Sequence, residues 1–167
     1  MKKQITKEQA LLKLTAYCSA AEHCLADARK KLDAWDLPED EASDVVSFLL
    51  KEKYIDETRY ARAFAKDKML FARWGRNKVA FSLRRKAIPA DIIATALDEV
   101  FGSDSYDDAI AQVLAAKFRS LSYKNRYDAK TKLLRFGAGR GFEFNKMLPV
   151  VDKLVAGVTP GEYDDDF

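Results

Sequence analysis

Apolar residues recur at helical spacing along almost the whole chain, and no segment alternates polar and apolar positions over a useful length. Thr6 and Gln9 have the spacing of a capping box, which predicts where the first helix begins. Asp56 and Ser105 are the expected N-caps of two later helices. The pattern predicts an all-α protein, with apolar stripes at residues 11–25, 42–50, 92–100 and 106–114.

A repeat underlies these stripes. Leu32 and Leu83 are 51 residues apart, as are Leu83 and Leu134. An aliphatic residue followed by proline stands at the same offset after the first two leucines, as Leu37-Pro38 and Ile88-Pro89. Proline suits the first turn of a new helix. A helical period of this length indicates tandem three-helix repeats in an elongated, curved array.

We expect three units, because one unit alone would bury too little core. In the third unit a glycine-rich stretch, 137–141, replaces the proline and predicts a turn between helices. It lacks the preceding strand and the Gly-Lys-Ser/Thr ending of a phosphate-binding loop. The expected units are residues 1–55, a basic unit at 56–102 and 103–158, followed by an acidic C-terminal tail at 159–167.

Positive charge is concentrated in the middle of the chain. The 167 residues hold 29 basic and 26 acidic side chains, but residues 59–86 hold ten basic residues and one acid, Asp67. A local field of this kind attracts polyanions. The sequence therefore favours a nucleic acid or an acidic protein surface as partner.

Helical spacing separates basic from apolar positions in this segment. Across residues 59–74 the apolar face is expected to bury Tyr60, Ala63, Phe64, Leu70, Phe71 and Trp74. In the next helix, 76–86, Val79 and Leu83 are expected to be buried. The alternative, an ordinary solvated face, is weakened by the near-absence of acids. The candidate partner- or DNA-binding residues are Arg59, Arg62, Lys66, Arg73, Arg76, Lys78, Arg84, Arg85 and Lys86.

Two side-chain roles follow from this helical placement. Tyr60, Phe71 and Trp74 could stack on bases, but their place on the apolar face favours core packing. Asp67 falls on the same face, where a buried carboxylate needs partners, so we expect it to pair with a basic side chain or to cap a nearby helix. Reversing Arg59, Arg62 and Arg73 to glutamate is expected to leave the fold intact.

The sequence offers no catalytic or metal-binding constellation. Cys18, His23 and Cys24 have no recognised zinc spacing, and ordinary packing is expected for them. The histidine is accompanied by no nucleophile motif. We therefore expect neither enzyme activity nor a cofactor or metal. No apolar run is long enough to cross a bilayer, and no signal-peptide core follows the first residues, so we expect a cytoplasmic protein. We also expect it to be a monomer.

Several motifs resemble the RecX family of recombination regulators. They are the run from Leu50 to Phe64, then Asp67-Lys68, Trp74-Gly75-Arg76, Leu83, Lys86, Ile88 and Arg140-Gly141-Phe142. The resemblance extends from about residue 10 to residue 155. Asp36 and Ala87 stand where family members usually have glycine, and a left-handed helix cap is strained for alanine. The first unit has Ala20-Ala21-Glu22 in place of the family's basic run.

The resemblance implies a specific role in recombination and the DNA-damage (SOS) response. Such proteins consist of tandem three-helix repeats and bind the RecA recombinase. They lodge in the groove of its filament on single-stranded DNA and oppose filament growth, ATP hydrolysis and strand exchange. Two other classes stay open, a helical-repeat nucleic-acid-binding protein that acts independently of RecA and an enzyme that acts on DNA.

Overall fold

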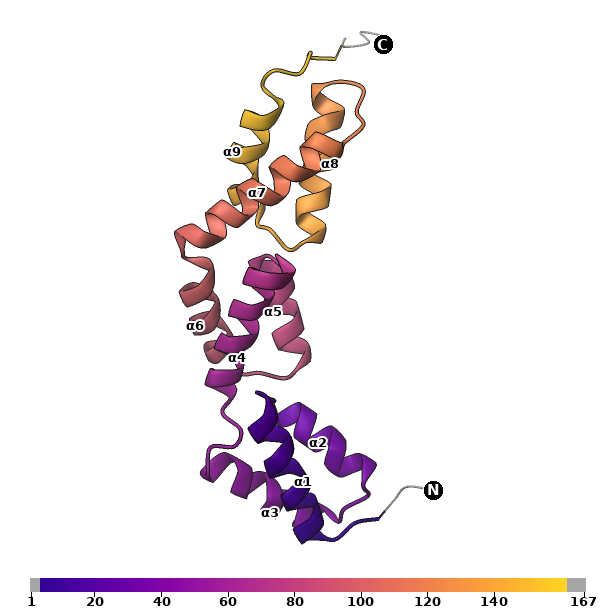
Figure 1. Ribbon diagram of the computed structural model, residues 1–167, viewed down its shortest axis with the longest axis vertical. Coiled ribbons are helices and arrows are strands. Elements are labelled where there is room, and N and C mark those ends of the chain that lie inside the picture. The colour runs from indigo at the N-terminus through magenta and orange to yellow at the C-terminus, as the bar shows by residue number, and fades with distance from the viewer. Residues whose placement is uncertain (1–3, 162–167) are drawn as a thin grey trace. The chain divides into compact units, whose positions relative to one another are not determined.

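The computed structural model describes residues 4–161, and every regular element in this range is helical (Figure 1). The all-α prediction is confirmed. The acidic residues predicted to form the tail, from Glu162 onward, lie outside the described range. The elements are α1 (Lys7–Ala20), α2 (Leu25–Ala34), α3 (Glu39–Lys51), α4 (Glu57–Asp67), the π-helix η1 (Lys68–Ala72), α5 (Arg76–Arg85), α6 (Ala90–Phe101), α7 (Asp104–Ser120), α8 (Arg126–Gly139) and α9 (Phe144–Val155).

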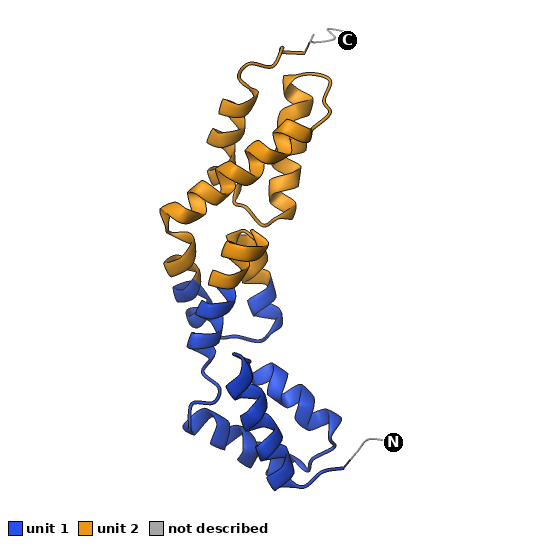
Figure 2. Ribbon diagram, in the orientation of Figure 1, with its two compact units in different colours: residues 1–65, 82–96 blue, residues 66–81, 97–167 orange. Residues whose placement is uncertain are grey.

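The chain divides into two compact units (Figure 2). Unit 1 comprises residues 1–65 and 82–96, and unit 2 comprises residues 66–81 and 97–167. In unit 1, helices α1 and α2 both pack against α3 around a core that includes Leu14, Leu32 and Leu49. In unit 2, helices α7, α8 and α9 pack against one another. The boundaries of the three repeats expected from the sequence stay a prediction.

Two of the three N-caps predicted from the sequence, Thr6 and Asp56, are confirmed. The Gln9 N–H donates to Thr6 Oγ1 at 3.1 Å and the Thr6 N–H donates to Gln9 Oε1 at 3.0 Å, which completes the capping box. Asp56 Oδ1 accepts from the Arg59 N–H at 3.0 Å. The prediction for Ser105 is wrong, because α7 begins at Asp104 with Ser103 as its N-cap.

One type of helix ending recurs three times, after α2, α5 and α8. In each case a residue with positive φ follows the helix, namely Asp36 (56°), Ala87 (56°) and Gly141 (92°). The next N–H donates back to a carbonyl five residues earlier, from Leu37 to Leu32, from Ile88 to Leu83 and from Phe142 to Gly137. This is a Schellman ending. The left-handed turn is therefore kept even where glycine is replaced by aspartate or alanine.

These endings correct the register of the third repeat. The carbonyl that accepts the last bond belongs to Leu32, Leu83 and Gly137, so the third copy is offset by 54 residues rather than 51. Leu134 is therefore not the counterpart of Leu83. Most of the predicted glycine-rich turn lies inside α8. Gly137 is buried there, and a Cβ at this position would collide with Met147 Sδ.

Replacing Ala87 with glycine is expected to raise the free energy of unfolding by about 1 kcal/mol, because glycine adopts the left-handed conformation without the clash that alanine incurs. Ala94→Gly, on the exposed side of α6, is the matched control and should lower it by about 1 kcal/mol. Denaturant unfolding followed by circular dichroism measures both. If both substitutions changed the free energy of unfolding in the same direction, backbone strain at Ala87 would be excluded.

The π-helix η1 changes which side chains after α4 are buried. Ala61 and Ala65 are fully buried and Met69 is 5% exposed, whereas Leu70 and Phe71 are 42% and 80% exposed. The prediction that Leu70 and Phe71 are buried is therefore wrong, and it is wrong as well for Ala63, which is exposed on α4. Asp67 is exposed as well, so it is not the buried carboxylate that was expected. Hydrogen bonds from i to i+5 widen the turn and shift the phase of every residue beyond it.

Candidate partner-binding surface

The nine candidate basic residues are divided between the two units. Unit 1 holds Arg59 and Arg62 on α4, with Arg84, Arg85 and Lys86 at the end of α5. Unit 2 holds Lys66, Arg73, Arg76 and Lys78. The side chains of Arg59, Arg62, Lys66, Arg84 and Arg85 are exposed, and those of Arg73, Arg76, Lys78 and Lys86 are half-buried.

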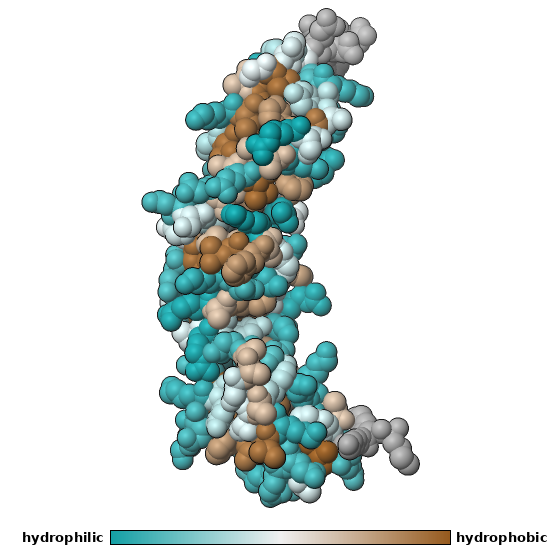
Figure 3. Space-filling model, in the orientation of Figure 1, coloured by the Kyte–Doolittle hydropathy of each residue, from teal (hydrophilic) through white to brown (hydrophobic). Residues whose placement is uncertain are grey.

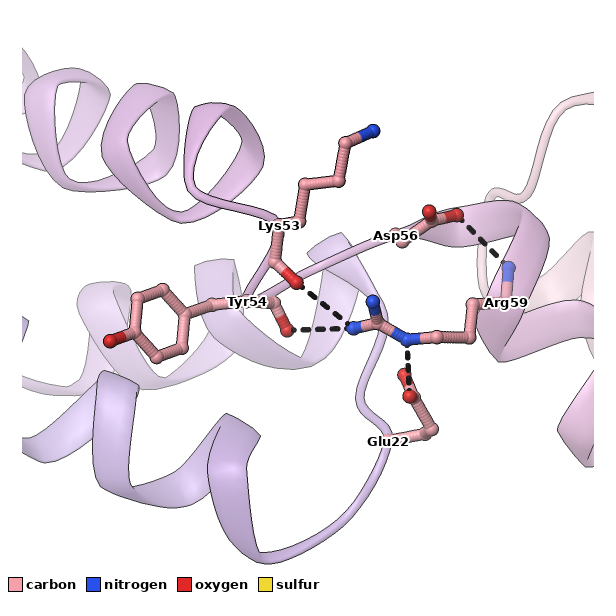
Figure 4. A network of polar contacts seen from close by, with 5 residues as sticks. All are labelled: Glu22, Lys53, Tyr54, Asp56 and Arg59. Carbon is pink, nitrogen blue, oxygen red and sulfur yellow. Dashed lines mark hydrogen bonds and ion pairs between the residues drawn. The ribbon is translucent and has the colours of Figure 1, made fainter.

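Arg59 is held in place by the first repeat (Figure 4). Its Nε–H donates to Glu22 Oε1, in the link between α1 and α2. Its Nη2 donates to the carbonyl oxygens of Lys53 at 3.0 Å and Tyr54 at 3.4 Å. One guanidinium thus ties together three points of unit 1. Arg59 is therefore a structural residue, and its head group is engaged within the chain.

Lys86 has a similar structural role. Its Nζ lies 2.6 Å from Asp27 Oδ1 on α2, and the Cys24 N–H donates to the other oxygen of the same carboxylate at 3.3 Å. Burial alone would raise the pKa of Asp27, but the bonds from Lys86 and Cys24 hold it below its ordinary value. The same bond raises the pKa of Lys86. Both groups are therefore charged at neutral pH and tie α2 to the end of α5.

Two candidate cations of unit 2 also have partners. Arg76 Nη2 lies 2.7 Å from Asp98 Oδ1. Lys78 Nζ lies 4.4 Å from the centre of the Trp74 ring, and Lys68 Nζ lies 4.8 Å from it. Cation–π contacts of this kind occupy the ring. The Trp74 ring thus contacts two lysine side chains of its own unit, and the side chain is half-buried.

Of the other five candidates, Arg73 is half-buried and the other four are exposed. Arg62 and Lys66 lie on exposed positions of α4, and Arg84 and Arg85 on the last turn of α5. Arg62 and Arg85 also interact with other groups of the chain. Lys66, in unit 2, and Arg84, in unit 1, are therefore the clearest exposed cations among the candidates.

Unit 2 contains a close backbone crossing that sequence spacing did not reveal. The Gly75 N–H donates to the Arg140 carbonyl at 2.7 Å, and the Asn77 N–H donates to the Gly141 carbonyl at 3.0 Å. A Cβ on Gly75 would lie well within 3.0 Å of the Gly141 backbone, and one on Gly141 equally close to Lys78. The motifs Trp74-Gly75-Arg76 and Arg140-Gly141-Phe142 thus meet at their glycines, where only glycine allows the approach.

Buried polar groups reinforce this crossing. The Tyr106 hydroxyl donates to Glu143 and accepts from the Arg76 N–H at 3.2 Å. Burial, together with the bond to Glu143, raises the pKa of Tyr106 well above its ordinary value. The start of α5 is thereby fixed to α7 and to the residue that precedes α9.

The described part of the chain offers neither a metal-binding cluster nor a helix that could span a membrane. Within residues 4–161 no three His, Cys, Asp or Glu side chains are grouped so that they could hold a metal ion. Among the helices described there, none is both long and apolar enough to cross a membrane. Cys18 and Cys24 are buried and not paired.

Several curated proteins with similar sequences are named regulatory protein RecX. Residues 56–97 match the family description "RecX, second three-helix domain". A protein named regulatory protein RecX from Leuconostoc mesenteroides is 27% identical over 141 residues, which are 83% of this chain and 52% of the relative. One from Clostridium tetani is 32% identical over 115 residues, 66% of this chain and 51% of the relative. The chain thus spans about half the length of these curated relatives.

Solved structures show the same fold. A crystal structure of RecX from Lactobacillus salivarius superposes with a TM-score of 0.74 and 19% identity, and covers 89% of this chain and 96% of that one. A crystal structure of regulatory protein RecX gives a TM-score of 0.76 with 20% identity, and covers 90% of this chain and 72% of that one. The match over residues 56–97 and the named relatives agree with each other, and the solved structures share the fold: the chain is similar to RecX proteins over most of its length.

Proposed function

We propose that this chain is a non-enzymatic regulator of homologous recombination that binds RecA on single-stranded DNA. It would oppose filament growth, ATP hydrolysis and strand exchange, acting in the cytoplasm as a monomer. The observation that carries the proposal is the match of residues 56–97 to the second RecX domain. The same segment supplies exposed cations, among them Lys66 and Arg84. Exposed cations suit a partner that contains single-stranded DNA, because the phosphates of the DNA are negatively charged.

Binding to preformed filaments tests the proposal. A fluorescently labelled chain is titrated with RecA filaments on single-stranded DNA, and separately with the bare DNA, at physiological salt. Tighter binding to the filament than to the bare strand is expected. Lys66→Glu and Arg84→Glu should each weaken filament binding without changing the thermal unfolding, because both side chains are exposed. Equal affinity for filament and bare DNA would contradict the proposal.

A second candidate is a helical-repeat nucleic-acid-binding protein that acts independently of RecA. The concentration of ten basic residues in 59–86 favours it. Because Arg59, Arg76 and Lys86 are ion-paired within the chain, fewer cations are available for phosphates than the sequence suggests. Affinity for single-stranded DNA is expected to fall with salt, with a log–log slope of about −0.7 for each phosphate contacted. Lys66→Glu should make that slope shallower, whereas binding insensitive to salt would exclude this surface as a DNA contact.

A further inference from the structure

The segment after α4 exposes two large apolar side chains. Phe71 is 80% exposed and Leu70 is 42% exposed, and both belong to the π-helix η1. The helix is closed by Arg73, which has a left-handed backbone with φ of 56°, and the Arg73 and Trp74 N–H groups both donate to the Lys68 carbonyl. Phe71 is therefore presented on a turn whose backbone is defined, and π-helical turns are frequent at functional sites.

Apolar surface and positive charge occur together here. Apolar side chains gather at the surface over the C-terminal end of α4 and η1 (Figure 3). Residues 66–78 carry five basic side chains and one acid. An apolar centre with charged residues around it is the usual anatomy of a protein interface. The positive charge around it complements an acidic partner surface.

We propose that Leu70 and Phe71 are the apolar anchor through which this chain docks into a hydrophobic pocket on an acidic protein surface. The partner assignment rests on the proposed function, under which that surface belongs to the RecA filament. A protein partner fits better than a nucleic acid because Leu70 has no aromatic face on which a base could stack. In addition, the neighbouring Trp74 ring is already occupied by Lys68 and Lys78.

Two substitutions at one position separate protein docking from base stacking. Phe71→Ala removes the apolar side chain, whereas Phe71→Leu keeps most of its apolar surface and removes the aromatic ring. Both should fold normally, because the side chain is exposed. The matched control is Phe144→Ala, at a 60% exposed position at the start of α9. Thermal unfolding confirms that all variants are folded.

Each labelled variant is titrated with RecA filaments on single-stranded DNA and with the bare DNA. Phe71→Ala should weaken filament binding at least about tenfold, as truncation of an interface hot spot does. Phe71→Leu should stay within about threefold of the wild type, as should Phe144→Ala, and binding to bare DNA should not change.

Three outcomes would overturn the proposal. Wild-type affinity of Phe71→Ala for the filament would show that the side chain is no anchor. Equal losses for Phe71→Ala and Phe71→Leu on bare DNA would identify it as a base-stacking residue instead. A wild-type chain that binds the bare DNA but not the filament would overturn the proposed function, and this partner assignment with it.

Discussion

Replacing Gly75 with alanine is expected to lower the free energy of unfolding by about 3 kcal/mol or more. The new Cβ would lie well within 3.0 Å of the Gly141 carbonyl group and the Phe142 nitrogen, all of them backbone atoms. Backbone atoms cannot rotate away as a side chain can, so the two chain segments that contain Gly75 and Gly141 must move apart. That separation breaks the bonds from the Gly75 N–H to Arg140 and from the Asn77 N–H to Gly141, each worth about 1 kcal/mol.

Gly139→Ala is the matched control, since a Cβ there would meet nothing within 4 Å. It should leave stability unchanged or raise it slightly, because alanine is the better helix former. Urea unfolding followed by circular dichroism compares the two. A Gly75→Ala protein as stable as the wild type would show that the crossing does not hold unit 2 together.

Reversing Arg59 to glutamate should destabilise unit 1 by about 2 kcal/mol. The substitution places a second carboxylate beside Glu22 and removes the bonds to the carbonyls of Lys53 and Tyr54. The side chains of Arg59 and Glu22 are 43% and 33% exposed, so solvent screening keeps the share of the ion pair itself small. Most of the loss comes from the carbonyl bonds and from the new repulsion.

Lys66→Glu, an exposed reversal on the same helix, is the control and should not change stability. Combining Arg59→Glu with Glu22→Arg should recover part of the loss, because the ion pair is restored with its charges exchanged. If Arg59→Glu and Lys66→Glu unfold at the same denaturant concentration, the network in Figure 4 contributes nothing to stability.

This result would also revise an expectation from the sequence. Helical spacing placed Arg59, Arg62 and Arg73 away from the apolar face, so their reversal to glutamate was expected to leave the fold intact. In the structure the Arg59 guanidinium donates to Glu22, and Arg73 has a left-handed backbone. A helical wheel describes only one helix, so it could not show that Glu22, 37 residues earlier, lies opposite Arg59. The departure Ala20-Ala21-Glu22 was the available signal, because an acid replaces the family's basic run there.

Local rules predicted what depends on local geometry. The helical class, the capping box at Thr6 and the burial of Val79 and Leu83 all follow from spacing and cap chemistry. The exposure of Phe71 could not be predicted from helical spacing. A π-helical turn changes which face of the helix each later residue occupies, and it has no compositional signature. The 54-residue offset of the third repeat could not be predicted either, since Gly137 occupies the place of Leu83 and only hydrogen bonds reveal the equivalence.

The most direct test of the central claim, that this chain regulates RecA, is its effect on the DNA-dependent ATPase of RecA. Two titrations are run at one RecA concentration, with two different excess amounts of single-stranded DNA. The account predicts inhibition at amounts of the chain too small to coat the DNA, with the same half-inhibiting concentration in both titrations. A half-inhibiting concentration that rises in proportion to the DNA would contradict it and identify a protein that merely covers the strand.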